Sequence, residues 1–120
     1  MSAGDCLFIS GATGNNAGFI NGGYDRTGEM CGGFALYRKR GDPSMIMEHH
    51  DGAWEVKPVS HKGTAGCYAY VAGGCAAEAC TSRIWRVHDG EAWADAPLVK
   101  MVAEAEVRSC CMPSCAFLTL

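Results

Sequence analysis

The feature that most constrains the fold is a pair of similar turn segments. His50–Trp54 and His88–Trp93 both begin His-Asp-Gly and reach a tryptophan soon afterwards. Asp-Gly is a strong signal for the tight turn of a β-hairpin, because glycine readily adopts a positive φ. The sequence therefore predicts two hairpins of similar chemistry, as in a β-meander or a weak internal duplication. One such pair is too few to predict a solenoid or a propeller.

Short β-prone runs lie between turn signals along the rest of the chain. Sixteen glycines in 120 residues favour turns and strands over long helices, because glycine destabilises a helix interior. Within 54–59, apolar residues alternate with Glu55 and Lys57, which is typical of a strand with two different faces. Pro58 should end that strand or place it at a sheet edge, because proline donates no ladder hydrogen bond. The predicted strands are 6–10, 33–38, 45–48, 54–59, 67–71, 83–87 and 98–102.

The number and spacing of the strands predict the fold class. About six or seven strands at roughly ten-residue spacing are typical of an all-β domain, either a small antiparallel sandwich or a distorted barrel of hairpins. A chain of 120 residues and 12.7 kDa suits one domain. We expect the β domain to cover residues 1–102. A short C-terminal extension, helix or coil with an apolar, cysteine-containing tail, should cover 103–120.

Charge and hydropathy exclude two kinds of role. The 10 Lys and Arg residues against 13 Asp and Glu give a formal net charge of -3, so we expect no nucleic-acid binding. The basic run Arg38–Arg40 is then a solvated strand end rather than a phosphate site. No stretch reaches the ~18 apolar residues of a spanning helix, so we expect a chain that is soluble or peripheral to a membrane complex. No secretory signal is recognisable. An organelle leader that is cleaved from the chain remains an alternative, so the localisation is unknown.

Two motifs suggest ligand chemistry and also have simpler structural explanations. Ile9–Ile20 resembles the glycine-rich turn of nucleotide-binding folds, but Asn21–Tyr24 would stop the helix that must follow, so we expect a surface loop. Glu48–Asp51 has the side chains of a metal site, yet strand alternation places only Glu48 and His50 on one face. His61 or His88 would have to join them, because two ligands do not make a zinc site. We therefore expect a polar hairpin shoulder, with no metal or cofactor.

Eight cysteines leave redox chemistry open. Cys6 and Cys67 lie in apolar runs and are expected to be ordinary buried thiols. No Cys-x-x-Cys occurs, and nothing singles out a catalytic cysteine beside His61. The candidates for disulfide bonds are Cys75, Cys80, Cys110, Cys111 and Cys115. A cysteine-based redox or metal protein is the weakest of three functional hypotheses.

Aromatic residues supply the second functional hypothesis. At alternating strand positions, aromatic rings either pack in a core and across strands or form a platform on which a sugar stacks. Together with the loop Gly11–Tyr24, exposed rings would line the site of a small-ligand or glycan-binding β domain. The rings concerned are those of Trp54, Trp85, Trp93, Tyr68 and Tyr70.

An ordered series of short motifs runs from Phe8 to about Val102. The motifs are Ser10–Gly14, Asn21–Tyr24, Thr27–Glu29, Gly32–Gly33, Tyr37–Asp42, Trp54–Val56, Lys62–Gly63 and Trp85–Gly90. The series resembles a small β module of microalgal and other protist proteins and covers most of the chain. The resemblance implies a reusable β module rather than an enzyme, and it brings no catalytic residue.

The first functional hypothesis is a non-catalytic structural or protein-interaction module. No convergent catalytic set is recognisable in the sequence, so we expect an accessory subunit of a larger assembly, organelle and membrane-associated assemblies included. The apolar tail lies outside the module and should dock on other protein subunits. The residues expected to make that contact are Met112, Phe117, Leu118 and Leu120.

Overall fold

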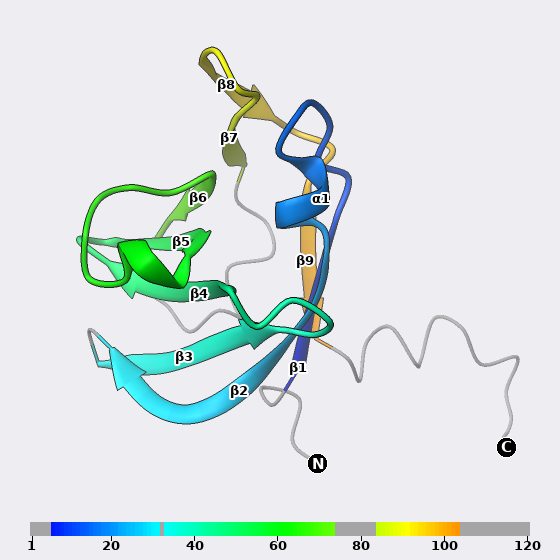
Figure 1. The fold of residues 1–120 in the computed structure, drawn as a ribbon. Coiled ribbons are helices and arrows are strands. Elements are labelled where there is room, and N and C mark those ends of the chain that lie inside the picture. The colour runs from blue at the N-terminus through cyan, green and yellow to red at the C-terminus, as the bar shows by residue number, and fades with distance from the viewer. Residues whose placement is uncertain (1–5, 32, 74–83, 104–120) are drawn as a thin grey trace, which may run out of the picture.

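The computed structural model describes residues 6–31, 33–73 and 84–103, which form one antiparallel β-sheet with two short helical turns (Figure 1). The all-β fold class is therefore confirmed. The strands are β1 (Cys6–Ser10), β2 (Gly22–Cys31), β3 (Phe34–Lys39), β4 (Met45–His50), β5 (Ala53–Pro58), β6 (Ala69–Ala72), β7 (Trp85–His88), β8 (Trp93–Ala96) and β9 (Lys100–Ala103). The helical turns are α1 (Ala17–Ile20) and η2 (Val59–His61).

The sheet is a meander that curls on itself (Figure 1). Its order is β8-β7-β6-β5-β4-β3-β2-β1-β9, so β8 and β9 follow each other in the chain yet lie at opposite ends of the sheet. A flat sheet of this order would separate its end strands by about 38 Å at a strand spacing of ~4.8 Å. The link from Ala96 to Lys100 spans at most about 15 Å. The sheet must therefore curl, and of the two expected architectures the distorted barrel is the one found.

The first predicted hairpin turn is confirmed in detail. Asp51 and Gly52 have φ values of 50° and 83°, and His50 pairs with Ala53 across the turn. Two central residues with positive φ make a type I′ turn, which matches the twist of the flanking strands. Pro58 ends β5, as its missing N–H predicts.

The second hairpin turns with different geometry. His88 pairs with Trp93, so the connection is longer than in the first hairpin. The Asp89 carboxylate accepts hydrogen bonds from the backbone N–H groups of Glu91 and Ala92, at 2.9 and 3.0 Å. The two turn segments are similar in sequence, but the inserted residue changes the loop.

The longest strand, β2, is absent from the predicted set. Its sequence carries three charged residues and three glycines, so it lacks the apolar alternation by which strands are recognised. Gly28 has a φ of 86°, and the register with β3 shifts between Arg26 and Met30. A β-bulge of this kind needs glycine and disguises a strand in the sequence.

The hydrophobic core lies on one face of the curled sheet. Trp54 and Val56 of β5 are buried there, as are Trp85 and Val87 of β7. Full burial of each such side chain contributes about 1.5–3 kcal/mol. Helix α1 adds Ile20 to the same core, which fixes the segment before β2 against the sheet.

Helix α1 falls within the segment that was expected to be a loop. A four-residue helix leaves its last carbonyl groups without internal partners. Lys39 Nζ donates to the Gly18 carbonyl at 2.5 Å, and the Tyr24 hydroxyl donates to the Ile20 carbonyl at 2.7 Å. Burial raises the pKa of Tyr24, and the charge of Asp42 adds to the effect. Side chains of the sheet thus stabilise a helix that the local sequence alone does not predict.

Several predicted residues lie outside the described ranges. They are the tail residues Met112, Phe117, Leu118 and Leu120 and the disulfide candidates Cys75, Cys80, Cys110, Cys111 and Cys115. Among the residues that the structure describes, no helix is long and apolar enough to cross a membrane.

Candidate functional site

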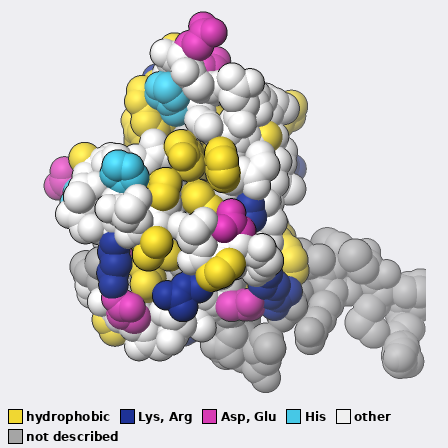
Figure 2. Space-filling view, in the orientation of Figure 1, with side chains coloured by type: hydrophobic (Ala, Val, Ile, Leu, Met, Phe, Trp, Pro, Cys, Tyr) yellow, Lys and Arg dark blue, Asp and Glu magenta, His cyan; other side chains and the backbone are white. Residues whose placement is uncertain are grey.

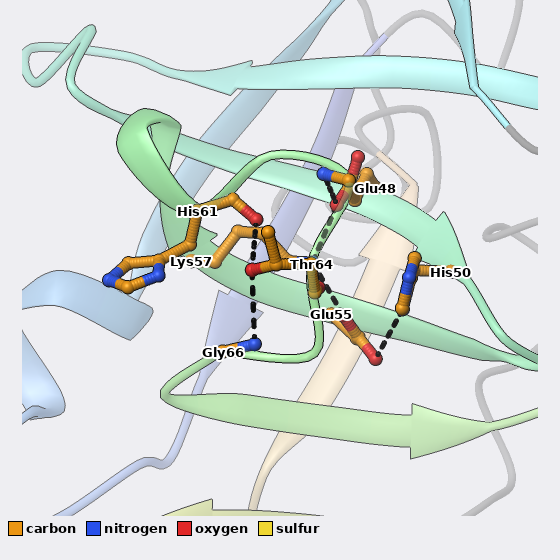
Figure 3. Close-up of polar contacts among 8 residues, drawn as sticks. Glu48, His50, Glu55, Lys57, His61, Thr64 and Gly66 are labelled. Atoms are coloured by element: carbon orange, nitrogen blue, oxygen red, sulfur yellow. Dashed lines mark hydrogen bonds and ion pairs between the residues drawn. The ribbon is translucent and has the colours of Figure 1, made fainter.

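A buried cluster of charged side chains lies beside β4 and β5 (Figure 3). Glu48 and Lys57 are fully buried, and Glu55 is 7% exposed. Lys57 Nζ lies 2.5 Å from Glu48 Oε2 and 2.5 Å from Glu55 Oε1. His50 Nδ1 lies 3.5 Å from Glu55 Oε2. One ammonium thus joins two carboxylates out of water, an arrangement that is costly unless the charges are paired.

The same cluster holds the segment that follows β5. The Gly63 N–H donates to Glu48 Oε2 at 2.8 Å, and Lys57 Nζ donates to the Thr64 carbonyl at 2.7 Å. The Thr64 hydroxyl in turn donates to the His61 carbonyl at 2.7 Å. The buried charges therefore fix the backbone of a turn that carries His61 on its outer side.

The two carboxylates also fix the charge of Lys57. Burial by itself disfavours the ammonium, but the hydrogen bonds to Glu48 and Glu55 outweigh burial and raise the pKa of Lys57. The cation that organises the turn therefore persists well above neutral pH.

A pocket opens between this turn and the β7–β8 hairpin. Its volume is about 430 Å³, within the range of small-molecule sites. On this side of the molecule hydrophobic side chains gather in the middle, with histidines near them (Figure 2). We call it the aromatic pocket; it is lined by Pro58, His61, Ala65, Gly66, Cys67, Tyr68, His88 and Trp93.

Trp93 is the most prominent ring of the aromatic pocket. It is 39% exposed and packs on two other rings. Its centroid lies 5.3 Å from that of His88, its cross-strand partner, with an interplanar angle of 80°. It also reaches over β7 to Tyr70 of β6, at 5.2 Å and 65°. These edge contacts orient the indole before any ligand binds.

A second pair of rings borders the aromatic pocket. Phe19 of α1 stacks on Tyr68, with centroids 5.1 Å apart and an interplanar angle of 19°. The Asn16 side chain donates to the His88 carbonyl at 2.6 Å, which ties the segment before α1 to β7. Phe19 is not among the residues predicted from the sequence, although a lone aromatic residue among glycines and asparagines is a usable signal.

The polar side chains of the aromatic pocket offer donors from Trp93, Tyr68 and His88, and the Tyr68 hydroxyl and the His61 ring also offer acceptors. His88 Nδ1 accepts from the Gly90 N–H at 3.2 Å, so neutral His88 carries its proton on Nε2. In the described part of the chain, the Tyr68 hydroxyl and the Trp93 indole N–H make no hydrogen bond. No Asp, Glu, Asn or Gln is among the described residues that line the pocket.

Gly66 permits the position of His61. A Cβ at Gly66 would lie 2.9 Å from His61 Nδ1, which is closer than such atoms approach. The Gly66 N–H also donates to the Thr64 hydroxyl at 3.3 Å. A small residue is thus needed for the imidazole to lie against this turn.

The structure brings Cys67 and His61 to the same pocket, but it does not activate the thiol. Burial raises the pKa of Cys67 to about 11, and the charge of Glu55 adds to the effect. A cysteine nucleophile acts as its thiolate, which is scarce at neutral pH with this pKa. Cys6 and Cys67 are free thiols; Cys6 is buried as expected, whereas Cys67 is only partly buried because it lies in the wall of the pocket.

The five-ring platform is wrong for two of its members. Trp54 and Trp85 are each 1% exposed and belong to the core, because both stand at inward positions of their strands. Trp93, Tyr68 and Tyr70 remain in the aromatic pocket or beside it.

Residues Glu48–Asp51 lead into the hairpin turn, as predicted, and Glu48 and His50 also belong to the charged cluster. Glu48 and His50 share the face that carries the charged cluster, whereas His49 points the other way and packs on Phe34, with ring centroids 4.4 Å apart. Within the described ranges, no group of three side chains is placed to hold a metal ion. His61 and His88 both line the aromatic pocket and do not join Glu48 and His50 in a ligand set.

The other two candidate motifs are structural in the described chain. Arg40 pairs with Asp25 at 2.9 Å, and Lys39 is buried beneath α1. The strand after the glycine-rich segment pairs antiparallel with β1, whereas a dinucleotide-binding unit needs a parallel pair. Neither motif is arranged as a phosphate site.

Comparisons of the chain with protein-family models, with curated proteins and with solved structures find no match.

Proposed function

We propose that this chain is a non-catalytic protein-interaction module, an accessory subunit of a larger assembly, and that it contacts its partner with the aromatic pocket. The observation that carries this proposal is Trp93, an exposed tryptophan held in place by Tyr70 and His88. Exposed, preoriented tryptophan and tyrosine side chains supply much of the binding energy at protein interfaces.

Two other observations support a binding role rather than catalysis. The high pKa of Cys67 deprives the pocket of its one strong nucleophile. The resemblance of residues 8–102 to a β module of microalgal and other protist proteins also implies a reusable module. The apolar tail with Met112, Phe117, Leu118 and Leu120 remains a second proposed contact.

Carbohydrate binding is the other candidate function, and the same indole favours it. A sugar ring stacks on an exposed tryptophan, and the two histidines near Trp93 offer polar contacts. The lining residues within the described ranges include none of the carboxylate and amide side chains that would accept hydrogen bonds from several sugar hydroxyls. The protein-interaction proposal therefore ranks first.

The test is the native mass of the particle that carries the full chain in a gentle extract of its source. We expect a mass far above 12.7 kDa, and we expect Trp93→Ala to release the chain from the particle. The matched control is Met30→Ala, which truncates another exposed apolar side chain, 60% exposed, outside the pocket. A free wild-type monomer would overturn the proposal.

The two proposed contacts are separated by a further variant. Deletion of residues 109–120 should release the chain if the tail is the principal contact. Retention of the Trp93→Ala chain together with loss of the truncated chain would remove the aromatic pocket from the proposal.

A further inference from the structure

We infer that the aromatic pocket binds a proline-rich segment of the partner protein in the polyproline II conformation. This inference rests on the proposed function and names the class of partner that the same pocket recognises. Three properties of the described residues carry it: the hydrogen-bonding character of the pocket, the arrangement of its rings and its lack of charge.

The aromatic pocket offers hydrogen-bond donors to a ligand. Trp93 offers an indole N–H, Tyr68 a hydroxyl and neutral His88 an Nε2–H, and none of the lining residues that the structure describes has a carboxylate or amide side chain. A polyproline II segment has no internal hydrogen bonds, and its prolines have no N–H. Such a segment presents carbonyl acceptors almost alone, which is the complement of this donor set.

Other extended ligands fit this donor set less well. A β-strand peptide presents N–H groups as well as carbonyls, and a sugar hydroxyl donates as well as accepts. Among the side chains of the described lining, the main acceptors are the Tyr68 hydroxyl oxygen and a ring nitrogen of His61, so either ligand would bury more donors than these side chains can pair. Unpaired buried donors cost binding energy, so the pocket discriminates in favour of proline.

The arrangement of the rings supports the same ligand. Phe19 and Tyr68 form one stacked unit, and Trp93 with Tyr70 forms another. Grooves lined by aromatic side chains are a recurring mode of polyproline II recognition, because proline rings pack flat against them. Pro58 adds an apolar ring to the lining, which also includes Tyr68 and Trp93.

The absence of charge in the pocket is the third property. Its lining, in the part of the chain that the structure describes, contains no Asp, Glu, Lys or Arg, and the buried Glu48–Lys57–Glu55 cluster lies behind the turn that forms one wall. A partner segment of neutral residues therefore meets no uncompensated charge. A segment rich in lysine or glutamate would lose hydration without gaining an ion pair.

The experiment is an NMR titration of the full chain with blocked octaproline. The signal observed is the indole N–H of Trp93, identified by its disappearance in Trp93→Phe. We expect octaproline to shift this signal in a saturable way, and we expect a Gly-Ser octapeptide and a cello-oligosaccharide to leave it unmoved. The other two indoles, of Trp54 and Trp85, are buried and should move little.

Variants then separate ring packing from hydrogen bonding. Trp93→Phe keeps an aromatic ring without the donor, so octaproline should bind about 3- to 10-fold more weakly, the range of one net hydrogen bond. Trp93→Ala should abolish saturable binding, whereas Met30→Ala should bind like the wild type. Full affinity in Trp93→Phe would overturn the donor argument and with it this inference.

The outcomes also distinguish this inference from the proposed function. If Trp93→Ala releases the chain from its native particle but octaproline does not bind, the inference is wrong and the interaction module stands. If the cello-oligosaccharide alone shifts the Trp93 signal, the site is a carbohydrate site. If Trp93→Ala stays in the native particle, the pocket is not the protein contact, whatever octaproline does.

Discussion

At the scale of single residues, Lys57 has the largest predicted effect on stability. Its ammonium is the cation between Glu48 and Glu55, and it donates to the Thr64 carbonyl. Lys57→Met leaves two carboxylates and a backbone carbonyl without that partner in a buried place. We expect a loss of about 3–5 kcal/mol in the free energy of unfolding, measured by urea denaturation.

The matched control for that substitution is Lys62→Met, a few residues along the chain. Lys62 pairs with Glu29, and both side chains are substantially exposed. Exposed pairs contribute at most about 1 kcal/mol, so this variant should unfold almost like the wild type. If the two variants lost the same free energy of unfolding, the buried cluster would stabilise the fold no more than the exposed pair does.

Sequence alternation predicted part of this cluster and not the rest. It placed Glu55 and Lys57 on the face of β5 opposite Trp54 and Val56, and the structure agrees. It could not show that the turn after β5 folds back over that face, because the contacts of Gly63 and Thr64 with the cluster are tertiary. Period-two patterns identify faces, not what covers them.

At the scale of elements, the segment between β1 and β2 is held by asparagine side chains. The Asn21 side chain donates to the Ala12 carbonyl at 3.0 Å and accepts from the Ala12 N–H at 3.0 Å. This reciprocal pair imitates one rung of a β-ladder. Asn21→Ala leaves the partly buried backbone groups of Ala12 without partners, and we expect a loss of about 1–3 kcal/mol in stability. Hydrogen exchange of the Ala12 amide should become faster, and the free energy of its protection should fall by a similar amount.

Asn15→Ala is the control for that element. The Asn15 N–H donates to the Asp89 carbonyl at 3.3 Å, and an alanine keeps that bond and loses only the exposed amide that lies beside Gly90. The variant should therefore stay close to wild-type stability. If Asn15→Ala lowers the free energy of unfolding as much as Asn21→Ala does, the whole segment limits stability, rather than the two hydrogen bonds between Asn21 and Ala12.

Most strands were predictable from local sequence, whereas one pairing was not. Seven predicted runs overlap strands of the structure, because apolar alternation and Asp-Gly turns are local signals. The pairing of β9 with β1 joins the two ends of the described chain and has no local signal. The aromatic pocket depends on similar long-range closure, since Asn16 meets His88 only once the sheet has curled.

At the scale of the whole molecule, the curl brings the residues of the aromatic pocket together. The pocket combines residues from the turn after β5, the segment just before β6 and the β7–β8 hairpin, and α1 adds Phe19 at its border. No one of these segments forms the pocket by itself. The buried core and the buried charges therefore serve the pocket indirectly, by fixing where each segment lies.

The loss of folding stability at high pH also depends on groups from different parts of the molecule. Burial raises the pKa of Cys67 to about 11 and raises that of Tyr24, and the carboxylates of the charged cluster raise that of Lys57 against the opposing effect of burial. Each group holds its proton more tightly in the folded chain than in the unfolded chain. The contribution of each group to the free energy of unfolding is therefore fully present below its pKa in the unfolded chain. It is lost as the pH rises toward its pKa in the folded chain.

The loss should begin with Cys67, whose ordinary pKa of 9.0 is the lowest of the three. We expect the stability of the wild type relative to Cys67→Ala to decline between about pH 9 and 11, as measured by urea denaturation under reducing conditions. The comparison cancels the contributions of Tyr24 and Lys57, which both proteins share. Met30→Ala should instead keep a constant offset from the wild type. If the wild type and Cys67→Ala run parallel across this range, burial does not hold the Cys67 proton, and an accessible thiolate would restore the Cys67–His61 pair as a catalytic candidate.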